Sequence, residues 1–312
     1  MKINNIVNSI TSFYEKMSCF GKLLFFLALF LILSVVFKSL SFPKREGFEQ
    51  KDKFLFKDST NIYDNFYTEI YDFLVFNSIK NNYEIGQIIN TTLPSNKSKI
   101  LDVGSGTGHH VAQLAENGLD VTGIDISPSM VSKAKSNFPD YDFKVADALN
   151  NNIFNSNTFT HILCLYFTIY YFEDKKVFLN NVMNWLIPGG YLIVHVVDRD
   201  QFDPILPPGN PLYVVSPQKY AKERITKTKV NFNEFVYTSN FNLIKDKDLA
   251  IFDEKFKFND GKVRKQEHKL YMEDKDKILS QATELGFIIK GKINLVNCAY
   301  ENQYLYILVK PS

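Results

Sequence analysis

The sequence has only three cysteines among its 312 residues, and Cys19, Cys164 and Cys298 lie far apart. An odd number of cysteines without a CxxC pair excludes a disulfide scaffold and a zinc knuckle, and it favours a reducing compartment. Charge of one sign is also lacking, since 36 Lys and Arg face 34 Asp and Glu. The chain therefore gives no strong nucleic-acid signal, because a dedicated nucleic-acid binder usually has a clear basic excess.

One long apolar run interrupts the otherwise globular composition. Residues 23–37 read LLFFLALFLILSVVF, with Ser34 as the only polar residue. At a helical rise of about 1.5 Å per residue they cover roughly 22 Å, and Lys22 and Lys38 flank the run. We expect residues 23–40 to form a retained transmembrane signal-anchor. A buried core helix and a cleaved signal peptide are the alternatives.

The residues around this run set the predicted membrane topology. The N-terminal tail, residues 1–22, contains three basic residues, and the following flank contains five at Lys38, Lys44, Arg45, Lys51 and Lys53. The positive-inside rule then predicts a single-pass membrane protein whose main domain faces the cytosol. Residues 41–58 are predicted to be a charged linker, and residues 59–312 the main domain.

Beyond the linker, short apolar runs alternate with helical patterns. Strands are predicted at residues 99–103, 121–125, 142–146, 161–165 and 191–197. Helices are predicted between them, and a helical segment at 59–93 precedes them. This alternation predicts an α/β fold with a doubly wound, mostly parallel sheet that is covered by helices on both faces.

The alternation breaks after the fifth strand. Residues 202–272 contain period-2 stretches that predict an inserted set of antiparallel strands. After a helix at 275–285, strands at 287–295 and 304–309 are joined by a short polar loop, so they should pair antiparallel. The insertion supplies aromatic and basic residues and is predicted to select the substrate, with a dimerisation or membrane-facing role as the alternative. Those residues are Tyr213, Tyr220, Arg224, Tyr237, Arg264 and His268.

A glycine-rich turn separates the first predicted strand from the helix that follows it. It reads DVGSGTG over residues 102–108, and glycines there let the backbone approach a ligand closely. His109 occupies the place where a dinucleotide-binding GxGxxG motif would need its last glycine. The absence of GK[ST] excludes a P-loop of the NTPase kind.

Two acidic residues end the next two strands. Asp125 follows the second strand, where a carboxylate can accept both hydroxyls of a ribose, and Asp147 follows the third. Each could serve alone as a cap or a solvated turn. Together with the glycine turn they place polar groups at the carboxyl ends of three strands, where open parallel sheets bind ligands.

These segments resemble the class I S-adenosylmethionine-dependent methyltransferases. The resemblance rests on ILDVGSGTGHHV, VTGIDIS and DFKVADAL in that order and spacing, and on LIPGGYLIVHVVD at the fifth strand. It covers residues 59–311 apart from the insertion. It implies a sheet of seven strands with an antiparallel last strand and S-adenosylmethionine as the cofactor.

The resemblance also implies a set of cofactor-binding residues. Asp102, Gly104, Gly106 and Gly108 would surround the methionine portion, and Asp125 would bind the ribose. Ile126 and Met130 would flank the adenine, with Asp147 on its amino group and Ala148 beside it. Cys164 and the residues to Phe167 would line the floor beneath the sulfonium, and the helix with Tyr63, Tyr67 and Tyr71 would cover the cofactor.

The transfer of a methyl group to oxygen or nitrogen requires an acceptor that loses a proton, and a nearby base assists. Tyr170 and His195 are the predicted catalytic residues; Tyr171, Asp198 and Arg199 are further candidates. A core histidine and core tyrosines are the competing interpretations. No metal site is predicted, because His109 and His110 have no second ligand cluster.

The sequence therefore predicts a methyltransferase that acts on an O or N acceptor in a small molecule. It leaves open which molecule that is and what the oligomeric state of the protein is. A membrane-tethered S-adenosylmethionine-binding protein without catalysis is the alternative. An NAD-dependent oxidoreductase is disfavoured by the glycine spacing and by the reversed final strand.

Overall fold

The computed structural model describes residues 18–41, 52–209 and 216–312. The chain divides into two units, Met1–Glu49 and Gln50–Ser312. Most of the predicted tail, the first part of the predicted linker and Tyr213 lie outside the described residues.

The predicted membrane segment falls within one helix, α2 (Cys19–Ser41). Over the described residues, no helix has the length and apolar character that a membrane span requires. The prediction of a transmembrane signal-anchor is therefore not supported. The apolar run at residues 23–37 has only fifteen residues, and its helical length of roughly 22 Å is shorter than the hydrocarbon core of about 30 Å. The cytosolic placement of the main domain remains a prediction.

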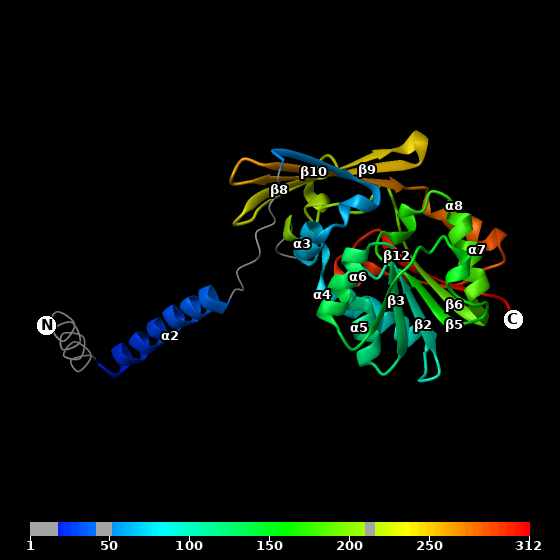
Figure 1. The fold of residues 1–312 in the computed structure, drawn as a ribbon, viewed down its shortest axis with the longest axis horizontal. Helices are drawn as coiled ribbons and strands as arrows, with labels where there is room; N and C mark the ends of the chain where they lie inside the picture. The colour runs from blue at the N-terminus through cyan, green and yellow to red at the C-terminus, as the bar shows by residue number, and fades with distance from the viewer. Residues whose placement is uncertain (1–17, 42–51, 210–215) are drawn as a thin grey trace. The chain divides into compact units, whose positions relative to one another are not determined.

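A mixed sheet of seven strands forms the centre of the main unit (Figure 1). Its strands, in spatial order, are β11 (Ile288–Asn294), β12 (Gln303–Val309), β6 (Leu186–Val197), β5 (Phe159–Cys164), β2 (Lys99–Val103), β3 (Asp120–Asp125) and β4 (Asp142–Val145). The five strands from β6 to β4 are parallel, and β12 is antiparallel to both of its neighbours. The α/β architecture and the reversed last strand agree with the sequence prediction.

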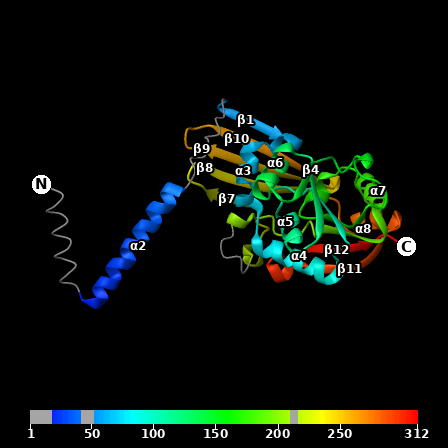
Figure 2. The ribbon, with the colours of Figure 1, turned by 60° about the horizontal axis from the view of Figure 1, so that its bottom comes forward.

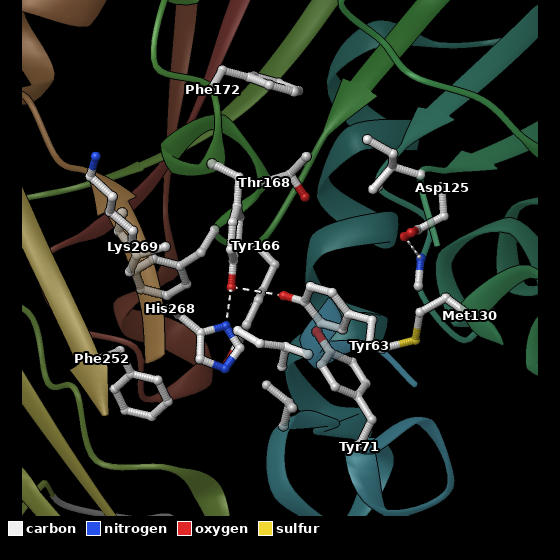
Figure 3. A pocket seen from close by; sticks show the side chains of 18 of the residues that line it. Tyr63, Tyr71, Asp125, Met130, Tyr166, Thr168, Phe172, Phe252, His268 and Lys269 are labelled. Carbon is white, nitrogen blue, oxygen red and sulfur yellow. Dashed lines mark hydrogen bonds between the residues drawn. The ribbon is translucent and has the colours of Figure 1, made fainter. Parts of the chain in front are cut away.

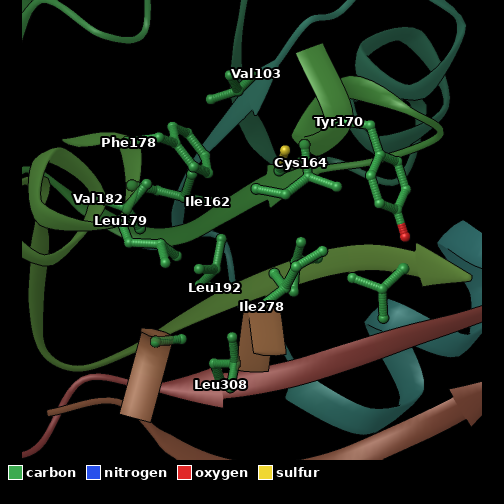
Figure 4. Close-up of a cluster of buried hydrophobic side chains, with 14 of the residues drawn as sticks. Val103, Ile162, Cys164, Tyr170, Phe178, Leu179, Val182, Leu192, Ile278 and Leu308 are labelled. Carbon is green, nitrogen blue, oxygen red and sulfur yellow. The ribbon is translucent and has the colours of Figure 1, made fainter. Parts of the chain in front are cut away.

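Helices cover both faces of this sheet because its strands are apolar on both sides. On one face, α7 (Lys175–Trp185) and α8 (Lys275–Glu284) pack on residues such as Ile162 and Leu192, as Figure 4 shows. On the other face, α4 (Ser78–Thr92), α5 (His109–Glu116) and α6 (Pro128–Asn137) pack on Ile100 and Leu163. Successive residues of one strand, such as Ile162 and Leu163, thus belong to different cores, as expected for a doubly wound sheet.

A second sheet of five strands contains the insertion (Figure 2). Its order is β1 (Phe54–Asp58), β10 (Val263–Tyr271), β9 (Leu249–Phe258), β8 (Phe235–Ile244) and β7 (Lys227–Asn231). The four strands of the insertion are antiparallel, as predicted, whereas β1 pairs in parallel with β10. Residues 54–58 were expected in the linker, so the linker prediction is wrong there, because Phe54–Asp58 gain a backbone partner in β10.

The second sheet packs on the segment that precedes the first sheet. Buried side chains of η1 (Ser59–Ile62) and α3 (Asn65–Val75) share one cluster with Phe235, Tyr237 and Phe256 of the insertion. Arg264 adds two hydrogen bonds, of 2.8 and 3.0 Å, to the carboxylate of Asp64, the N-cap of α3. The insertion is therefore part of the core of the main unit rather than a detachable appendage.

Candidate active site

The glycine turn lies between β2 and α5 and has the backbone that its sequence requires. Gly104 and Gly106 have φ values of 72° and 53°, in the left-handed region that glycine adopts without strain. A Cβ on Gly106 would meet only Tyr71, at 3.9 Å, so this position borders open space. Gly108 is different, because a Cβ there would lie 2.7 Å from the ring of Phe143. Gly108 thus serves packing between elements.

Asp125, at the end of β3, is held against the glycine turn. Its carboxylate accepts hydrogen bonds from the backbone N–H of Gly106 at 3.0 Å and from that of Ser127 at 2.9 Å. Burial raises the pKa of Asp125, and the two amide hydrogen bonds oppose this rise. Asp147, at the end of β4, accepts a hydrogen bond from Leu149 N–H at 2.9 Å. Both carboxylates line the same cavity.

Asp102, which precedes the glycine turn, is deeply buried, with 1% of its surface exposed. Its Oδ2 atom has no hydrogen-bond partner among the described residues. Burial raises the pKa of Asp102 to about 6, and His110 partly opposes this effect. A buried carboxyl oxygen without a partner is costly for the folded chain and is typical of a functional site.

The cavity has a volume of about 440 Å³, within the usual range for small-molecule sites. Figure 3 shows Asp125 and Met130 on one side of the cavity, and Phe252 and His268 on the other. Tyr63, Tyr67 and Tyr71 also line it, although Tyr63 precedes α3 and only the other two lie on that helix. The insertion provides part of the wall through Phe241, Phe252 and His268.

Seven of the predicted cofactor residues come together around the cavity. They are Gly104, Gly106, Asp125, Ile126, Met130, Asp147 and Ala148. Asp102, Gly108 and Cys164 do not line it. Cys164 lies in the core instead. Of the residues predicted to form the floor with it, Tyr166 and Phe167 line the cavity, together with Thr168.

The two predicted catalytic residues do not reach the cavity. Tyr170 is fully buried, and its hydroxyl accepts a hydrogen bond from Val197 N–H at 2.8 Å (Figure 4). His195 is also fully buried; its Nδ1 bonds to the carbonyl oxygen of Tyr166, and burial lowers its pKa to about 3. Both residues have the positions of core side chains, so the catalytic prediction is not supported by their placement.

A hydrogen-bonded chain that includes Tyr171 lies in the cavity instead. The hydroxyl of Tyr63 donates to that of Tyr171 at 2.8 Å, and Tyr171 Oη lies 2.8 Å from Nδ1 of His268. Nε2 of His268 lies 2.7 Å from a carboxylate oxygen of Glu254. The dashed lines in Figure 3 that reach Tyr63 and His268 mark their two bonds to the hydroxyl between them. Sequence reasoning named Tyr171 and His268 separately but missed Glu254 and the connection between them.

A metal site is not formed in the described parts of the chain, since they contain no group of three or more His, Cys, Asp or Glu residues suited to hold an ion. His109 instead bonds to Asp72 at 2.9 Å, and His110 lies 3.4 Å from Glu84.

The parallel sheet with its reversed last strand, and the glycine turn beside the carboxylate of β3, define a Rossmann-like α/β protein. Residues 101–194 match the family described as a methyltransferase domain. The fold is similar to that of an S-adenosylmethionine-dependent methyltransferase from Clostridium acetobutylicum. The match covers 80% of this chain and 99% of that structure, with 18% identity and a TM-score of 0.58. Residues 101–194 are therefore similar to a methyltransferase domain, and the fold is shared with this structure.

Two curated relatives match the same part of the sequence. A demethylmenaquinone methyltransferase from Chlorobaculum tepidum is 34% identical over 105 residues, which are 33% of this chain and 43% of the relative. A dTDP-4-amino-2,3,4,6-tetradeoxy-D-glucose N,N-dimethyltransferase from Saccharopolyspora spinosa is 29% identical over 114 residues, which are 36% of this chain and 45% of the relative. The match thus spans less than half the length of these relatives.

Proposed function

We propose that the protein is an S-adenosylmethionine-dependent methyltransferase that transfers a methyl group to an oxygen or nitrogen of a small molecule. One observation carries this proposal: a single cavity joins the glycine turn, Asp125 and Asp147 to an aromatic end formed by the insertion. A methyltransferase needs two ligands side by side, and a continuous cavity of about 440 Å³ suits a cofactor and a small acceptor.

The residues at the first end fit S-adenosylmethionine. The open space beside Gly106 admits a ligand close to the backbone, and a side chain there would fill it. The carboxylate of Asp125 lies at a strand end, where it can accept hydrogen bonds from ribose hydroxyls. Met130 and Ile126 would contact the adenine, and Asp147 its amino group.

The bound cofactor would supply an electrophilic methyl group on a sulfonium. The chain itself has to position the acceptor in line with that methyl and keep water away, and such positioning supplies much of the acceleration. Tyr63, Tyr67 and Tyr71 form an aromatic wall between the glycine turn and the insertion. Their packing on each other favours a fixed wall, which suits an in-line displacement.

The residues that line this cavity determine which acceptor the protein can bind. The two relatives are named for acceptors as different as a quinone precursor and an amino sugar. The matched segment ends at residue 194, whereas much of the aromatic end comes from residues 202–271. We therefore propose that the insertion selects the acceptor, as its position in the wall supports.

Replacement of Asp125 by alanine tests the cofactor site. We expect the variant to bind S-adenosylmethionine roughly 5- to 150-fold more weakly, because losing hydrogen bonds to a charged group costs about 1–3 kcal/mol. Isothermal titration calorimetry measures this directly. Asp142→Ala is the matched control, since Asp142 begins β4 at the opposite end of the sheet and bonds there to Thr122 and Lys144. Equal affinities in the two variants would contradict the placement of the cofactor.

Transfer of a labelled methyl group to small-molecule extracts distinguishes an enzyme from a binding protein. Labelled product from the wild-type chain, but not from Asp125→Ala, is expected. Tight cofactor binding without transfer to any fraction would instead favour the non-catalytic alternative.

A further inference from the structure

We propose that Tyr171, His268 and Glu254 form a proton-accepting relay at the acceptor end of the cavity, and that the acceptor is a hydroxyl on an aromatic ring. The inference rests on the proposed function. Tyr171 and His268 line the cavity, whereas Glu254 lies behind His268 with 2% of its surface exposed. Tyr171 and His268 can therefore touch a substrate, and Glu254 is a positioning residue.

The hydrogen bonds give the relay a direction. Glu254 accepts three of them: from Tyr237 Oη and Gln266 Nε2, both at 2.5 Å, and from Nε2 of His268 at 2.7 Å. Burial alone would raise the pKa of Glu254, but the bonds from His268, Tyr237 and Gln266 reverse this and lower it. Glu254 is thus an ionised acceptor, and the relay requires the His268 tautomer whose proton is on Nε2.

Nδ1 of His268 is then the basic atom that faces the cavity. It accepts the hydroxyl proton of Tyr171 at 2.8 Å. Tyr171 in turn accepts a hydrogen bond from Tyr63, and its hydroxyl is protonated at neutral pH because a phenol has an ordinary pKa near 10. Tyr171 keeps 39% of its surface accessible and lines the cavity, so its oxygen is open to a further proton donor. A substrate hydroxyl would be a second donor to this oxygen, beside that of Tyr63.

The relay is tied to the cofactor end of the cavity. The backbone carbonyl oxygen of Tyr63 accepts a hydrogen bond from Ser127 Oγ at 2.9 Å, two residues beyond Asp125. The ring of Tyr63 also packs on Tyr71, which borders Gly106. A substrate that contacts Tyr171 would therefore lie beside the glycine turn rather than in a separate chamber.

The chemistry of the relay favours a phenol-type acceptor. A phenolic hydroxyl has the acidity of a tyrosine side chain, so the proton passes between like groups, whereas an aliphatic hydroxyl of water-like acidity is about a million times weaker. The aromatic lining, including Tyr166, Phe172 and Phe252, suits a planar ring. Lys269 lines the same cavity, so its charge favours a phenolate and disfavours an ammonium acceptor.

The step balances within these groups. As the substrate oxygen attacks the methyl carbon, the O–C bond forms and the C–S bond breaks. The electron pair of the C–S bond stays on the sulfur, which becomes a neutral thioether. The substrate proton passes to Tyr171 Oη, and the proton of Tyr171 passes to Nδ1 of His268. The resulting imidazolium lies beside the Glu254 carboxylate, which stabilises the charge.

The test uses 4-nitrophenol as the probe, because its phenolate absorbs visible light and its phenol does not. The full-length chain is saturated with S-adenosylhomocysteine and titrated with 4-nitrophenol at a pH about one unit below the pKa of the free probe. We expect saturable binding and a phenolate-to-phenol ratio at least tenfold higher on the protein than in buffer.

Two tyrosine variants separate a relay from a simple hydrogen-bond network. Tyr171→Phe should bind the probe within a few-fold of the wild type and lose the phenolate signal. Tyr304→Phe changes a tyrosine of β12 that does not line the cavity, so it should keep the phenolate signal. Glu254→Gln should bind the probe with a smaller phenolate fraction, whereas a purely structural role would change binding itself.

A matched pair of histidine variants completes the design. His268→Gln should abolish the phenolate signal, and His161→Gln, which changes a buried histidine stacked on Tyr191, should not. An unchanged phenolate ratio in Tyr171→Phe, or no saturable binding of 4-nitrophenol to the wild type, overturns the inference. If S-adenosylhomocysteine itself fails to bind, the proposed function is wrong as well, so the two failures are distinguishable.

Discussion

Replacement of Gly106 by valine is expected to abolish detectable binding of S-adenosylmethionine. The backbone of Gly106 has a φ of 53°, where a β-branched residue is a strong outlier, and the space beyond its Cα belongs to the cavity. Two added methyl groups would overlap a ligand that lies against the turn. Overlap of this kind costs roughly 3 kcal/mol or more, which corresponds to at least about a hundredfold in affinity.

Gly118→Val is the matched control for backbone strain. Gly118 has a φ of 79° and no atom within 4 Å of a built Cβ, and it does not line the cavity. Both variants should lose about 1–2 kcal/mol of stability from the left-handed backbone, as measured by chemical denaturation. Only Gly106→Val should lose calorimetric binding. A Gly106→Val variant that binds normally would show that the ligand does not approach the glycine turn.

Replacement of Asp102 by asparagine is expected to stabilise the chain at neutral pH. The pKa of Asp102 is raised to about 6 in the folded state, against about 3.9 in an unfolded chain. Ionisation of this carboxyl therefore lowers the free energy of unfolding. The loss is absent below about pH 4, grows as the pH rises and is complete above about pH 6. The free energy of unfolding of Asp102→Asn should exceed that of the wild type by up to about 3 kcal/mol at pH 7.

The pH dependence of that difference is the decisive readout for Asp102. Denaturant unfolding at pH 7 and pH 4 should show the gain at the higher pH only. Asp120→Asn, at the exposed start of β3, should change stability by less than about 0.5 kcal/mol at either pH. An equal gain at both pH values would mean that the carboxyl is not the source of the cost.

Local features of the sequence predicted most of the central sheet and the cofactor end of the cavity. The turn at residues 104–108 and the acidic ends of β3 and β4 are short motifs, and parallel strands place their carboxyl ends together. Ser127 caps α6 through its side chain and Pro128 is the first residue of that helix, as the Ser-Pro pair predicts. Such signals depend only on neighbours along the chain.

The hydrogen-bonded chain of Tyr63, Tyr171, His268 and Glu254 was not found in this way, because its four residues come from four separate segments. Glu254 and His268 meet only through the pairing of β9 with β10, in which Glu254 lies opposite Gln266. Tyr63 and Tyr171 are 108 residues apart and join them from the first sheet's side of the cavity. Asp260-Gly261 is a turn signal between β9 and β10, and a register set from that turn would have placed Glu254 and His268 on one buried face.

His195 and Cys164 failed as site predictions for a related reason. Successive residues of a strand in a doubly wound sheet face opposite cores, so a position inside an apolar strand says little about access to the cavity. The residues that do reach it, Tyr166 to Thr168, follow β5 after the strand has ended. Similarly, α2 is a helix, as its apolar run predicts, but composition alone overestimated its capacity to span a membrane.

Calorimetric titration of the full-length chain with S-adenosylmethionine, and separately with NAD, tests the central claim most directly. We predict saturable binding of S-adenosylmethionine at one site per chain, no heat from NAD, and no binding in Gly106→Val. Saturable binding of NAD without binding of S-adenosylmethionine would contradict the assignment of the cavity to a methyl donor.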